Sequence, residues 1–299
     1  MSTSADYRLL LVNDHPGLAW LRESDAGSAW LDRLPRLVEE CSAQWSVTTG
    51  EPFGYAFASL ALPATRADGS GAVLKIQFPD RESELEAAAL VHWDGDGAVR
   101  LLEHDPGRRA LLLERCLPGT PLKKLEPGEA LDVFIDLLPR LWKPAGEPFR
   151  SLADEVAWWA GYLPDEFERA GRPFETELFE EALDAIRTLP GSQGELVLVN
   201  EDLHADNVLR AERQPWLVID PKPLAGEREF GVAAIVRGRE LGHTREAVIH
   251  RLDRVTEELH LDRERARRWA LAHTIAWAFD EGDVEIAHVE VARWLWEAR

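Results

Sequence analysis

Two short apolar runs, each followed by residues that can bind a metal ion or a proton, constrain this chain more than any other feature of its sequence. Residues 196–199 lead to Asp202 and then Asn207, and residues 216–219 end directly in Asp220. Apolar runs of this length, bounded by polar turn residues, are typical of buried strands. The sequence therefore predicts two strands that present carboxylate and amide groups at their ends.

The spacing of these groups matches the catalytic loop of kinases. Asp202 and Asn207 are five residues apart, and Asp220 follows thirteen residues later. In kinases the first Asp accepts the proton of the substrate hydroxyl, the Asn binds one Mg²⁺, and the later Asp binds Mg²⁺ beside the ATP phosphates. Carboxylate and amide oxygens suit this task because Mg²⁺ prefers hard oxygen ligands. Asp and Asn at this spacing are also common in ordinary loops, so a second signal is needed.

The second signal is a lysine inside an apolar strand. The chain has only five lysines against 29 arginines, yet Lys75 interrupts the run AVLKIQF. Such a lysine is either an exposed edge residue or a point charge placed for a phosphate. Kinases hold their phosphate-binding lysine by an ion pair with a helix glutamate. Glu86 follows eleven residues later, with Glu82 and Glu84 as rivals, and this order favours a kinase-like fold.

The hydrophobic pattern changes at residues 117–121. Before this point, strand-like runs and one helix, predicted at 81–93 after Asp80, indicate a mostly antiparallel sheet. Beyond it, apolar residues recur at helical spacing. The helical runs are ALDVFIDLLPRLW, SLADEVAWWAGYL, FETELFEEALDAIRTL, REAVIHRLDRVTEELHL and RERARRWALAHTIAWAFDEGD. We predict an α+β, bilobal, protein-kinase-like fold, with a nucleotide-binding β-rich lobe at 1–117 and a helical, catalytic and acceptor-binding lobe at 118–299.

Composition is that of a globular protein with an acidic surface. The chain has 299 residues, 45% of them apolar, which is enough to fill the core of one large domain or two lobes. Its net charge of −20 repels nucleic acid and anionic membranes and attracts small cations. Solubility alone also explains such a surface. We expect no nucleic-acid or membrane partner, and either a monomer or a dimer.

The N-terminus and the cysteines favour the cytoplasm. The run MSTSADYRLLLVNDHPG lacks the basic region, apolar core and cleavage site of a secretory signal. Apolar runs such as LALPA and VAAIV are shorter than the roughly 18 residues of a membrane span. Cys41 and Cys116 match no metal-ligand spacing and cannot form a disulfide framework, so we expect apolar fillers in a reducing compartment.

Three runs of the sequence resemble the aminoglycoside phosphotransferase family. They are LLLERCLPGTPL, HWDGDGAVRLLEHD and NVLRAERQPWLVIDPKPLAG. The chain is similar in particular to the streptomycin 6-phosphotransferase branch, which includes proteins named hydroxyurea phosphotransferase, from about residue 28 to about residue 280. This resemblance implies a bilobal kinase-like fold and transfer of the γ-phosphoryl group of ATP, with Mg²⁺, to an aminocyclitol hydroxyl. It also implies a role in inactivating streptomycin-type antibiotics.

The resemblance assigns roles residue by residue. Lys75 contacts the α- and β-phosphates, Glu86 orients it, Asp202 is the catalytic base, and Asn207 and Asp220 hold Mg²⁺. The adenine edge binds the backbone of the linker between lobes, which comprises Glu114, Arg115, Cys116 and Leu117.

Two further positions stay open. Gly50 and Gly54 occupy the place of a phosphate-covering loop, although GEPFGYAF is not a good glycine-rich signature. Lys222 follows the Mg²⁺ aspartate by two residues, and it either adds charge near the phosphates or pairs with a surface acid, the second being slightly favoured.

The sequence departs from the family at two supporting positions. Asn200 replaces a His that braces the catalytic loop, and an amide can still donate and accept hydrogen bonds. An acidic residue that steadies this loop is missing near Gly231, where Glu229 is a possible substitute. The direct ligands are all present, which favours an active enzyme. A pseudokinase or nucleotide-binding regulator, or a kinase of another small metabolite, is the alternative.

A streptomycin-like acceptor carries guanidinium groups, which carboxylates bind best. The candidate acceptor ligands are Asp154, Glu155, Glu201, Asp206, Glu229, Asp280, Glu281 and Asp283. A solvated surface acid is the simpler interpretation of each, and the group at 280–283 is the best candidate as a set. We expect Trp277 in the core and no transition metal at His204 or His243, because neither has a second ligand at zinc-like spacing.

Overall fold

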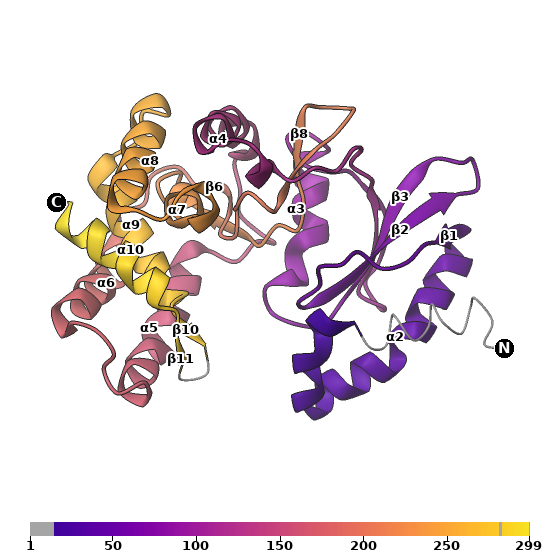
Figure 1. Cartoon of the computed structure of the whole chain (residues 1–299), viewed down its shortest axis with the longest axis horizontal. Helices are drawn as coiled ribbons and strands as arrows, with labels where there is room; N and C mark the ends of the chain where they lie inside the picture. Colours follow the sequence, from indigo (N-terminus) through magenta and orange to yellow (C-terminus); the bar gives the residue numbers. More distant parts are fainter. Residues whose placement is uncertain (1–14, 281–282, 299) are drawn as a thin grey trace. The chain divides into compact units, whose positions relative to one another are not determined.

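A computed structural model describes residues 15–280 and 283–298 of the chain. The chain divides into two compact units, and the division falls after Gly119, close to the boundary at residue 117 expected from the sequence. Figure 1 traces both units in the colours of the sequence.

Five antiparallel strands form the sheet of the N-terminal unit, in the order β1-β2-β3-β5-β4. Their bounds are β1 Val47–Thr49, β2 Ser59–Arg66, β3 Gly71–Gln77, β4 Leu101–Asp105 and β5 Ala110–Glu114. The expected hairpin joins β2 to β3, and Gly69 adopts a left-handed φ of 85° in its turn. The register places Lys75 opposite Ala61 and Leu111, so it lies in a central strand and is not an edge residue.

This unit contains a long helix that the sequence analysis does not predict. Helix α2 spans Asp25–Gln44 and follows the 3-10 helix η1, Pro16–Glu23. Its apolar residues recur at i, i+3 and i+4, and Trp30, Leu34 and Leu37 are buried along one stripe. Pro35 lies inside the helix but outside this buried stripe, and a proline normally ends or kinks a helix. The expectation of one helix in this unit is therefore wrong.

The expected helix at 81–93 forms, but its α-helical part is shorter. Helix α3 spans Glu86–Trp93, and the 3-10 turn η2, Ser83–Leu85, precedes it. Asp80 caps the segment as expected, because its carboxylate accepts a hydrogen bond from the Ser83 amide at 2.7 Å.

Alternation along β3 sends neighbouring side chains to opposite faces of the sheet. Leu74 and Ile76 join the apolar core that includes the buried face of α2. Lys75 and Gln77 point to the other face, where both contact Glu86 of α3. The two helices therefore cover opposite faces, and the buried Lys75–Glu86 pair lies on the face covered by α3.

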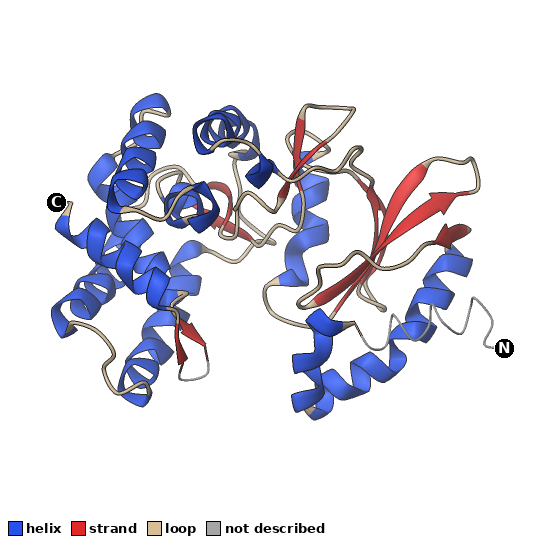
Figure 2. Cartoon of the chain, viewed as in Figure 1, coloured by secondary structure: helices blue, strands red, loops and turns tan. Residues whose placement is uncertain are grey.

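Helices make up most of the C-terminal unit, as the colouring of Figure 2 shows. They are α4 Pro127–Leu141, α5 Leu152–Arg169, α6 Thr176–Thr188, α7 Ala233–Arg237, α8 Arg245–Glu258, α9 Arg263–Ala276 and α10 Ile286–Glu297, with 3-10 turns η3 Leu122–Lys124, η4 Leu189–Ser192, η5 Phe230–Val232 and η6 Arg239–Leu241. Helix α9 packs against α6, α7, α8 and α10 and is buried along most of its length.

Three short antiparallel strand pairs complete this unit. They are β6 Val197–Asn200 with β9 Pro223–Gly226, β7 Val208–Arg210 with β8 Trp216–Val218, and β10 Phe279–Asp280 with β11 Asp283–Val284. The helix expected over 263–283 ends at Ala276, because pairing of Phe279 with Val284 replaces it.

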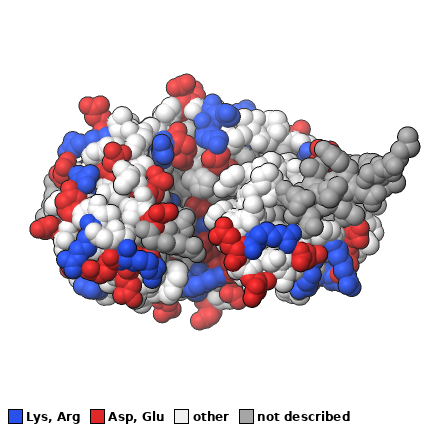
Figure 3. Space-filling model, turned by 60° about the horizontal axis from the view of Figure 1, so that its bottom comes forward, with Lys and Arg blue, Asp and Glu red and all other residues white. Residues whose placement is uncertain are grey.

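Charge is spread over the surface. On the face shown in Figure 3, Asp and Glu side chains are interspersed with Lys and Arg and do not gather in one block. Within the described ranges, no helix combines the length and apolar character needed to cross a membrane.

Candidate active site

Lys75 and Glu86 form a buried ion pair in the N-terminal unit. The Lys75 Nζ lies 2.6 Å from the Glu86 Oε2, and the two side chains are 6% and 0% exposed. The Gln77 side-chain Nε2 donates to the same carboxylate oxygen at 2.6 Å. The pairing involves the glutamate that the sequence analysis favours over Glu82 and Glu84.

Such a pair is an inefficient way to stabilise a fold. Removing two charges from water costs about as much as their attraction returns, and apolar residues of similar volume often serve stability better. Charges placed at this cost are concentrated at functional sites. The pair therefore marks Lys75 as a candidate for binding phosphate.

The Glu114 residue, at the end of β5 and the start of the linker, has a structural contact. The Glu114 amide donates to the Arg100 carbonyl at 2.9 Å, and the Glu114 carboxylate accepts from the Arg100 amide at 3.0 Å. Arg115, Cys116 and Leu117 follow outside the strand, with Cys116 buried. An adenine contact at these residues stays a prediction, and it concerns their backbone only.

The segment between β1 and β2 is anchored, although it is not rich in glycine. A Cβ at Gly50 would lie 3.0 Å from Pro63 Cγ, whereas a Cβ at Gly54 would meet nothing within 4 Å. The Phe57 ring stacks on Trp20 at 5.1 Å between centroids, and the Trp20 indole donates to the Phe57 carbonyl at 3.0 Å. Its function as a phosphate-covering loop stays a prediction.

The C-terminal unit brings Asp202, Asn207 and Asp220 onto adjoining backbone. The Asn207 side-chain Nδ2 donates to the Asp202 backbone carbonyl at 3.3 Å, and the Ile219 backbone amide donates to the Asn207 backbone carbonyl at 2.9 Å. Asp220 therefore follows directly from a residue bonded to Asn207. It adopts a left-handed φ of 49°, an uncommon conformation that Asp tolerates better than most residues. Strained backbone of this kind is concentrated at functional sites.

The donor set suits Mg²⁺. Asn207 and Asp220 supply amide and carboxylate oxygens, and Mg²⁺ usually takes one or two carboxylates together with waters and substrate phosphates. Across residues 15–280 and 283–298, no three His, Cys, Asp or Glu side chains form a metal cage. A site completed by waters and phosphates is consistent with both observations.

Asn200 braces the catalytic loop as expected. Its side-chain oxygen accepts from the Asp202 amide at 3.1 Å and from the Lys222 amide at 2.9 Å. The Asn200 side chain therefore links the segment that carries Asp202 and Asn207 to the segment that carries Asp220.

The second departure from the family has a steric reason. A Cβ at Gly231 would lie 2.8 Å from Trp142 Nε1 and 3.2 Å from Val199 Cγ1, so an acidic side chain does not fit there. Glu229 does not replace it, since its carboxylate accepts from the Asp262 amide at the start of α9. The loop is held instead by His273 and Glu240, which sequence reasoning misses because they lie far from it in the chain.

Lys222 contacts the candidate base directly. Its Nζ lies 3.3 Å from Asp202 Oδ2 and 4.6 Å from the centroid of the Trp277 ring. Lys222 therefore pairs with an acid, as the slightly favoured interpretation has it, but this acid is the candidate base, whose side chain is 14% exposed, and not a surface carboxylate. Trp277 is only partly buried, and the Arg237 guanidinium lies 4.7 Å from its ring, so the expectation of a core residue is wrong.

Arg237 adds a second cation to this group. It is 8% exposed, and burial lowers the pKa of its guanidinium to about 10 against the opposing effect of Asp202, Glu240 and Glu201. The positive charge of buried Arg237 therefore offsets the negative charges of these three acids.

Comparison with known proteins agrees with this arrangement. Residues 44–282 match the family described as aminoglycoside/hydroxyurea antibiotic resistance kinase. The chain belongs to this family. It is therefore a kinase that transfers phosphate, and the recognition made from its sequence is confirmed.

Two relatives are similar over most of their length. The streptomycin 6-kinase of Streptomyces griseus is 37% identical over 278 residues, which cover 90% of each chain. The hydroxyurea phosphotransferase of Kitasatospora aureofaciens is 38% identical over 275 residues, covering 89% of this chain and 79% of the relative.

A solved structure confirms the fold. The aminoglycoside phosphotransferase APH(4)-Ia aligns with a TM-score of 0.62 at 15% identity, covering 88% of this chain and 99% of that one. The α+β, protein-kinase-like fold class predicted from the sequence is therefore confirmed.

The carboxylates proposed for the acceptor are mostly engaged elsewhere in this kinase. Asp206 pairs with Lys123 at 2.6 Å, and Glu155 is buried against Arg150 at 3.1 Å. Asp154 bonds to Ser151 at the N-terminus of α5. Most of these acids therefore already have structural partners.

The remaining candidates lie in two places. Glu201 is buried beside Asp202, and its amide donates to the Lys222 carbonyl at 3.0 Å. Asp283 is exposed on β11. Asp280 belongs to β10, but its side chain, like the whole of Glu281, lies outside the described residues. Of the proposed set, Glu201 is the acid adjacent in sequence to the candidate base.

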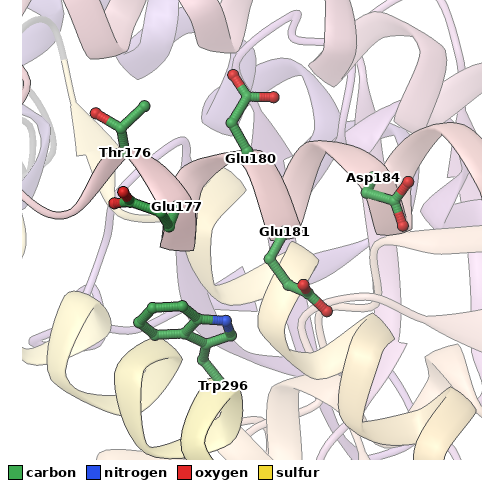
Figure 4. Close-up of a pocket in the computed structure, with 6 residues that line it drawn as sticks. All are labelled: Thr176, Glu177, Glu180, Glu181, Asp184 and Trp296. Atoms are coloured by element: carbon green, nitrogen blue, oxygen red, sulfur yellow. The ribbon is translucent and has the colours of Figure 1, made fainter.

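Two surface pockets of the kinase do not include the candidate ligands. The larger, of about 410 Å³, is lined by acidic residues of α6 together with Trp296 of α10 (Figure 4). It is lined by Thr176, Glu177, Glu180, Glu181, Asp184 and Trp296. The smaller, of about 210 Å³, is lined by residues of 237–243 and 285–291 and includes Arg237. The catalytic loop stays the better candidate site, since its chemistry matches the family.

Proposed function

We propose that this kinase is an ATP- and Mg²⁺-dependent O-phosphotransferase that acts on a cationic aminocyclitol or aminoglycoside, streptomycin being the first candidate. The observation that carries the proposal is the catalytic loop, in which Asp202, Asn207 and Asp220 lie on hydrogen-bonded backbone beside Lys222. The names of the relatives supply the acceptor class. Because ATP is the donor, the cytoplasm is the proposed compartment.

The proposed reaction is an in-line displacement. The Asp202 carboxylate accepts the proton of the acceptor hydroxyl, and the hydroxyl oxygen attacks the γ-phosphorus. The bond from the γ-phosphorus to the β–γ bridging oxygen breaks, and ADP leaves with the electron pair. The phosphate ester and a protonated Asp202 remain.

The surrounding residues position and neutralise charge. Lys75, held by Glu86, binds the α- and β-phosphates, and Asn207 and Asp220 hold Mg²⁺, which when bound neutralises charge on the phosphates. Lys222 holds the Asp202 carboxylate in one orientation and places a positive charge beside it. Rate then comes from positioning and electrostatics, as in other phosphoryl transfers.

A non-catalytic nucleotide-binding role is less well supported. The two departures from the family suggested it, but Asn200 still braces the loop and the direct ligands are retained.

The test is ADP release by purified protein with Mg²⁺-ATP against separate acceptors: streptomycin, other aminoglycosides, hydroxyurea and simple aminocyclitols. We expect stimulation by streptomycin and none in the Asp202→Asn variant. Stimulation by hydroxyurea alone would replace the acceptor class. No stimulation by any acceptor, with ATP still bound, would favour the regulator.

A further inference from the structure

Two polar side chains from distant parts of the chain hold the catalytic loop by its backbone. The His273 Nε2 of α9 lies 2.9 Å from the Glu201 carbonyl oxygen, in a fully buried contact. The Glu240 carboxylate of η6 accepts from the Ala205 amide at 2.9 Å. One contact precedes Asp202 and the other follows it, so the base lies between two fixed points.

The chemistry of the His273 contact fixes one protonation state. A carbonyl oxygen only accepts, so Nε2 carries the hydrogen and donates it. Burial, together with the nearby Arg237 charge, lowers the pKa of His273 well below 6.5, and the imidazole is therefore neutral. Its Nδ1 has no hydrogen-bond partner within the described part of the chain.

The unpaired Nδ1 makes histidine an unfavourable residue at this position unless another contact of the ring offsets its cost. A buried polar atom without a partner is unfavourable, and an apolar residue would avoid it. His273 is 0% exposed in the middle of the helical core, where packing alone would select Leu or Phe. The bond to the Glu201 carbonyl is the contact that an apolar residue cannot make.

The imidazole is held rigidly. Its ring stacks on Trp277 at 5.2 Å between centroids and meets the edges of Trp159 and Phe230 at 5.9 Å and 5.6 Å. Because three aromatic rings fix the orientation of the imidazole, the position of α9 determines where the Glu201 carbonyl of the loop is held. The loop needs such support because Gly231 leaves no room for an acidic brace.

We propose that His273 and Glu240 are positioning residues for phosphoryl transfer, which fix the backbone on both sides of Asp202 so that its carboxylate meets the acceptor hydroxyl. The proposal rests on the proposed function, in which Asp202 is the base. Neither residue touches the reacting atoms, and both act through the loop.

The decisive comparison is between two substitutions of His273. His273→Gln keeps an N–H donor near the position of Nε2, whereas His273→Leu removes it. We expect His273→Leu to lower kcat by about 10- to 100-fold, since misplacement by about 1 Å has effects of this size. The Kd for ATP stays unchanged, and His273→Gln recovers most of kcat.

Thr274→Val is the matched control for stability. Thr274 is equally buried in the same helix, and its hydroxyl donates to the Ala270 carbonyl of that helix. We expect Thr274→Val to change Tm about as much as His273→Leu does, with kcat near the parent value. Equal kcat losses in Thr274→Val and His273→Leu, or no recovery in His273→Gln, would show a structural role and overturn the proposal.

Glu240 gives a second test at a partly exposed position, where folding is less at risk. Glu240→Gln keeps an oxygen acceptor for the Ala205 amide, and Glu240→Ala removes it. We expect kcat to fall about tenfold in the Ala variant and to be retained in the Gln variant.

Asp202→Asn, measured in parallel, separates the two possible failures. Intact turnover in Asp202→Asn would overturn the base assignment and the proposed function with it. Intact turnover in both His273→Leu and Glu240→Ala, with Asp202→Asn inactive, would overturn the positioning role alone.

Discussion

The two units of this kinase place their functional charges by different means. In the N-terminal unit, Lys75 and Glu86 bond side chain to side chain, on a strand and a helix whose geometry is fixed by their own backbones. In the C-terminal unit, Asp202 lies on a loop, and polar side chains such as Asn200 and His273 bond to the backbone around it. Regular structure positions the first charge, and a hydrogen-bond network positions the second.

This difference predicts different consequences of substitution. A broken ion pair leaves a buried charge, so it affects folding as well as phosphate binding. A substitution within the loop, such as Asp202→Asn, leaves the core intact, so it affects turnover more than stability. Measuring both quantities for each variant tests the comparison.

The largest effect on turnover is expected at the base itself. Asp202→Asn removes the proton acceptor but keeps the shape of the side chain, so kcat should fall about 10³-fold. The Kd for ATP and the Tm should stay close to the parent values. Glu212→Gln, an exposed carboxylate in the turn between β7 and β8, is the control and should retain full turnover. A fall of less than tenfold would contradict the assignment of Asp202.

The ion pair should show the opposite balance. Lys75→Met leaves Glu86 buried without its cation, which should lower the free energy of unfolding by about 3–5 kcal/mol. The double variant Lys75→Met/Glu86→Leu removes both charges and should recover much of this loss in chemical denaturation. Neither variant should transfer phosphate at more than about 1% of the parent rate, since the phosphate ligand is absent.

Recovery of stability without activity would separate the two functions of the pair. If the double variant were as unstable as the single one, packing around Gln77 and not charge would explain the loss. If the double variant were active, Lys75 would not be the phosphate ligand.

The same difference explains what the sequence could predict. Lys75 was recognisable because a charged residue interrupts a short apolar strand, and the strand alternation and helix that pair it with Glu86 are local patterns. The apolar spacing of helix α2 is regular, but Pro35 stands inside it, and a proline normally argues against a continuous helix. In both cases the decisive information lies within about 20 residues of sequence.

The support of the catalytic loop is not local. His273 contacts a carbonyl 72 residues away in the sequence, and Glu240 contacts an amide 35 residues away. No spacing rule links such residues, because the packing of α9 and η6 brings them to the loop. The sequence also did not reveal the contact between Lys222 and Asp202. Lys222 lies two residues after Asp220, and a lysine at such a position has many possible partners.

Lys222 offers a finer test of the loop. Lys222→Met removes the ammonium 3.3 Å from the Asp202 carboxylate, and we expect kcat to fall about tenfold with little change in Tm. Lys222→Arg keeps the charge with a different shape and should lose less. Lys124→Met, an exposed lysine on η3, serves as the control for loss of charge alone. Equal rates for Lys222→Met and Lys124→Met would exclude a part for Lys222 in turnover.

The smallest expected effect is on the pH dependence of stability, which we attribute to His288 in the C-terminal unit. His288 donates from Nδ1 to the Trp277 carbonyl at 2.8 Å, and its Nε2 faces the Arg237 guanidinium at 3.4 Å. Burial and Arg237 lower the pKa of His288 to about 4 from the ordinary 6.5, and His243 acts in the same direction, while the hydrogen bond to the Trp277 carbonyl and the Glu285 charge oppose them.

Between pH 6.5 and pH 4 the unfolded chain therefore binds more protons at His288 than the folded chain, so stability falls as pH falls through this window. From pH 7 to pH 5.5 the contribution of His288 amounts to about 1 kcal/mol. His288→Gln keeps a polar side chain that cannot be protonated, so its denaturation curves at the two pH values should lie closer together by that amount. Parallel losses in the two proteins would place the acid sensitivity elsewhere, and buried His273, whose pKa is lowered in the same direction, would be the next residue to substitute.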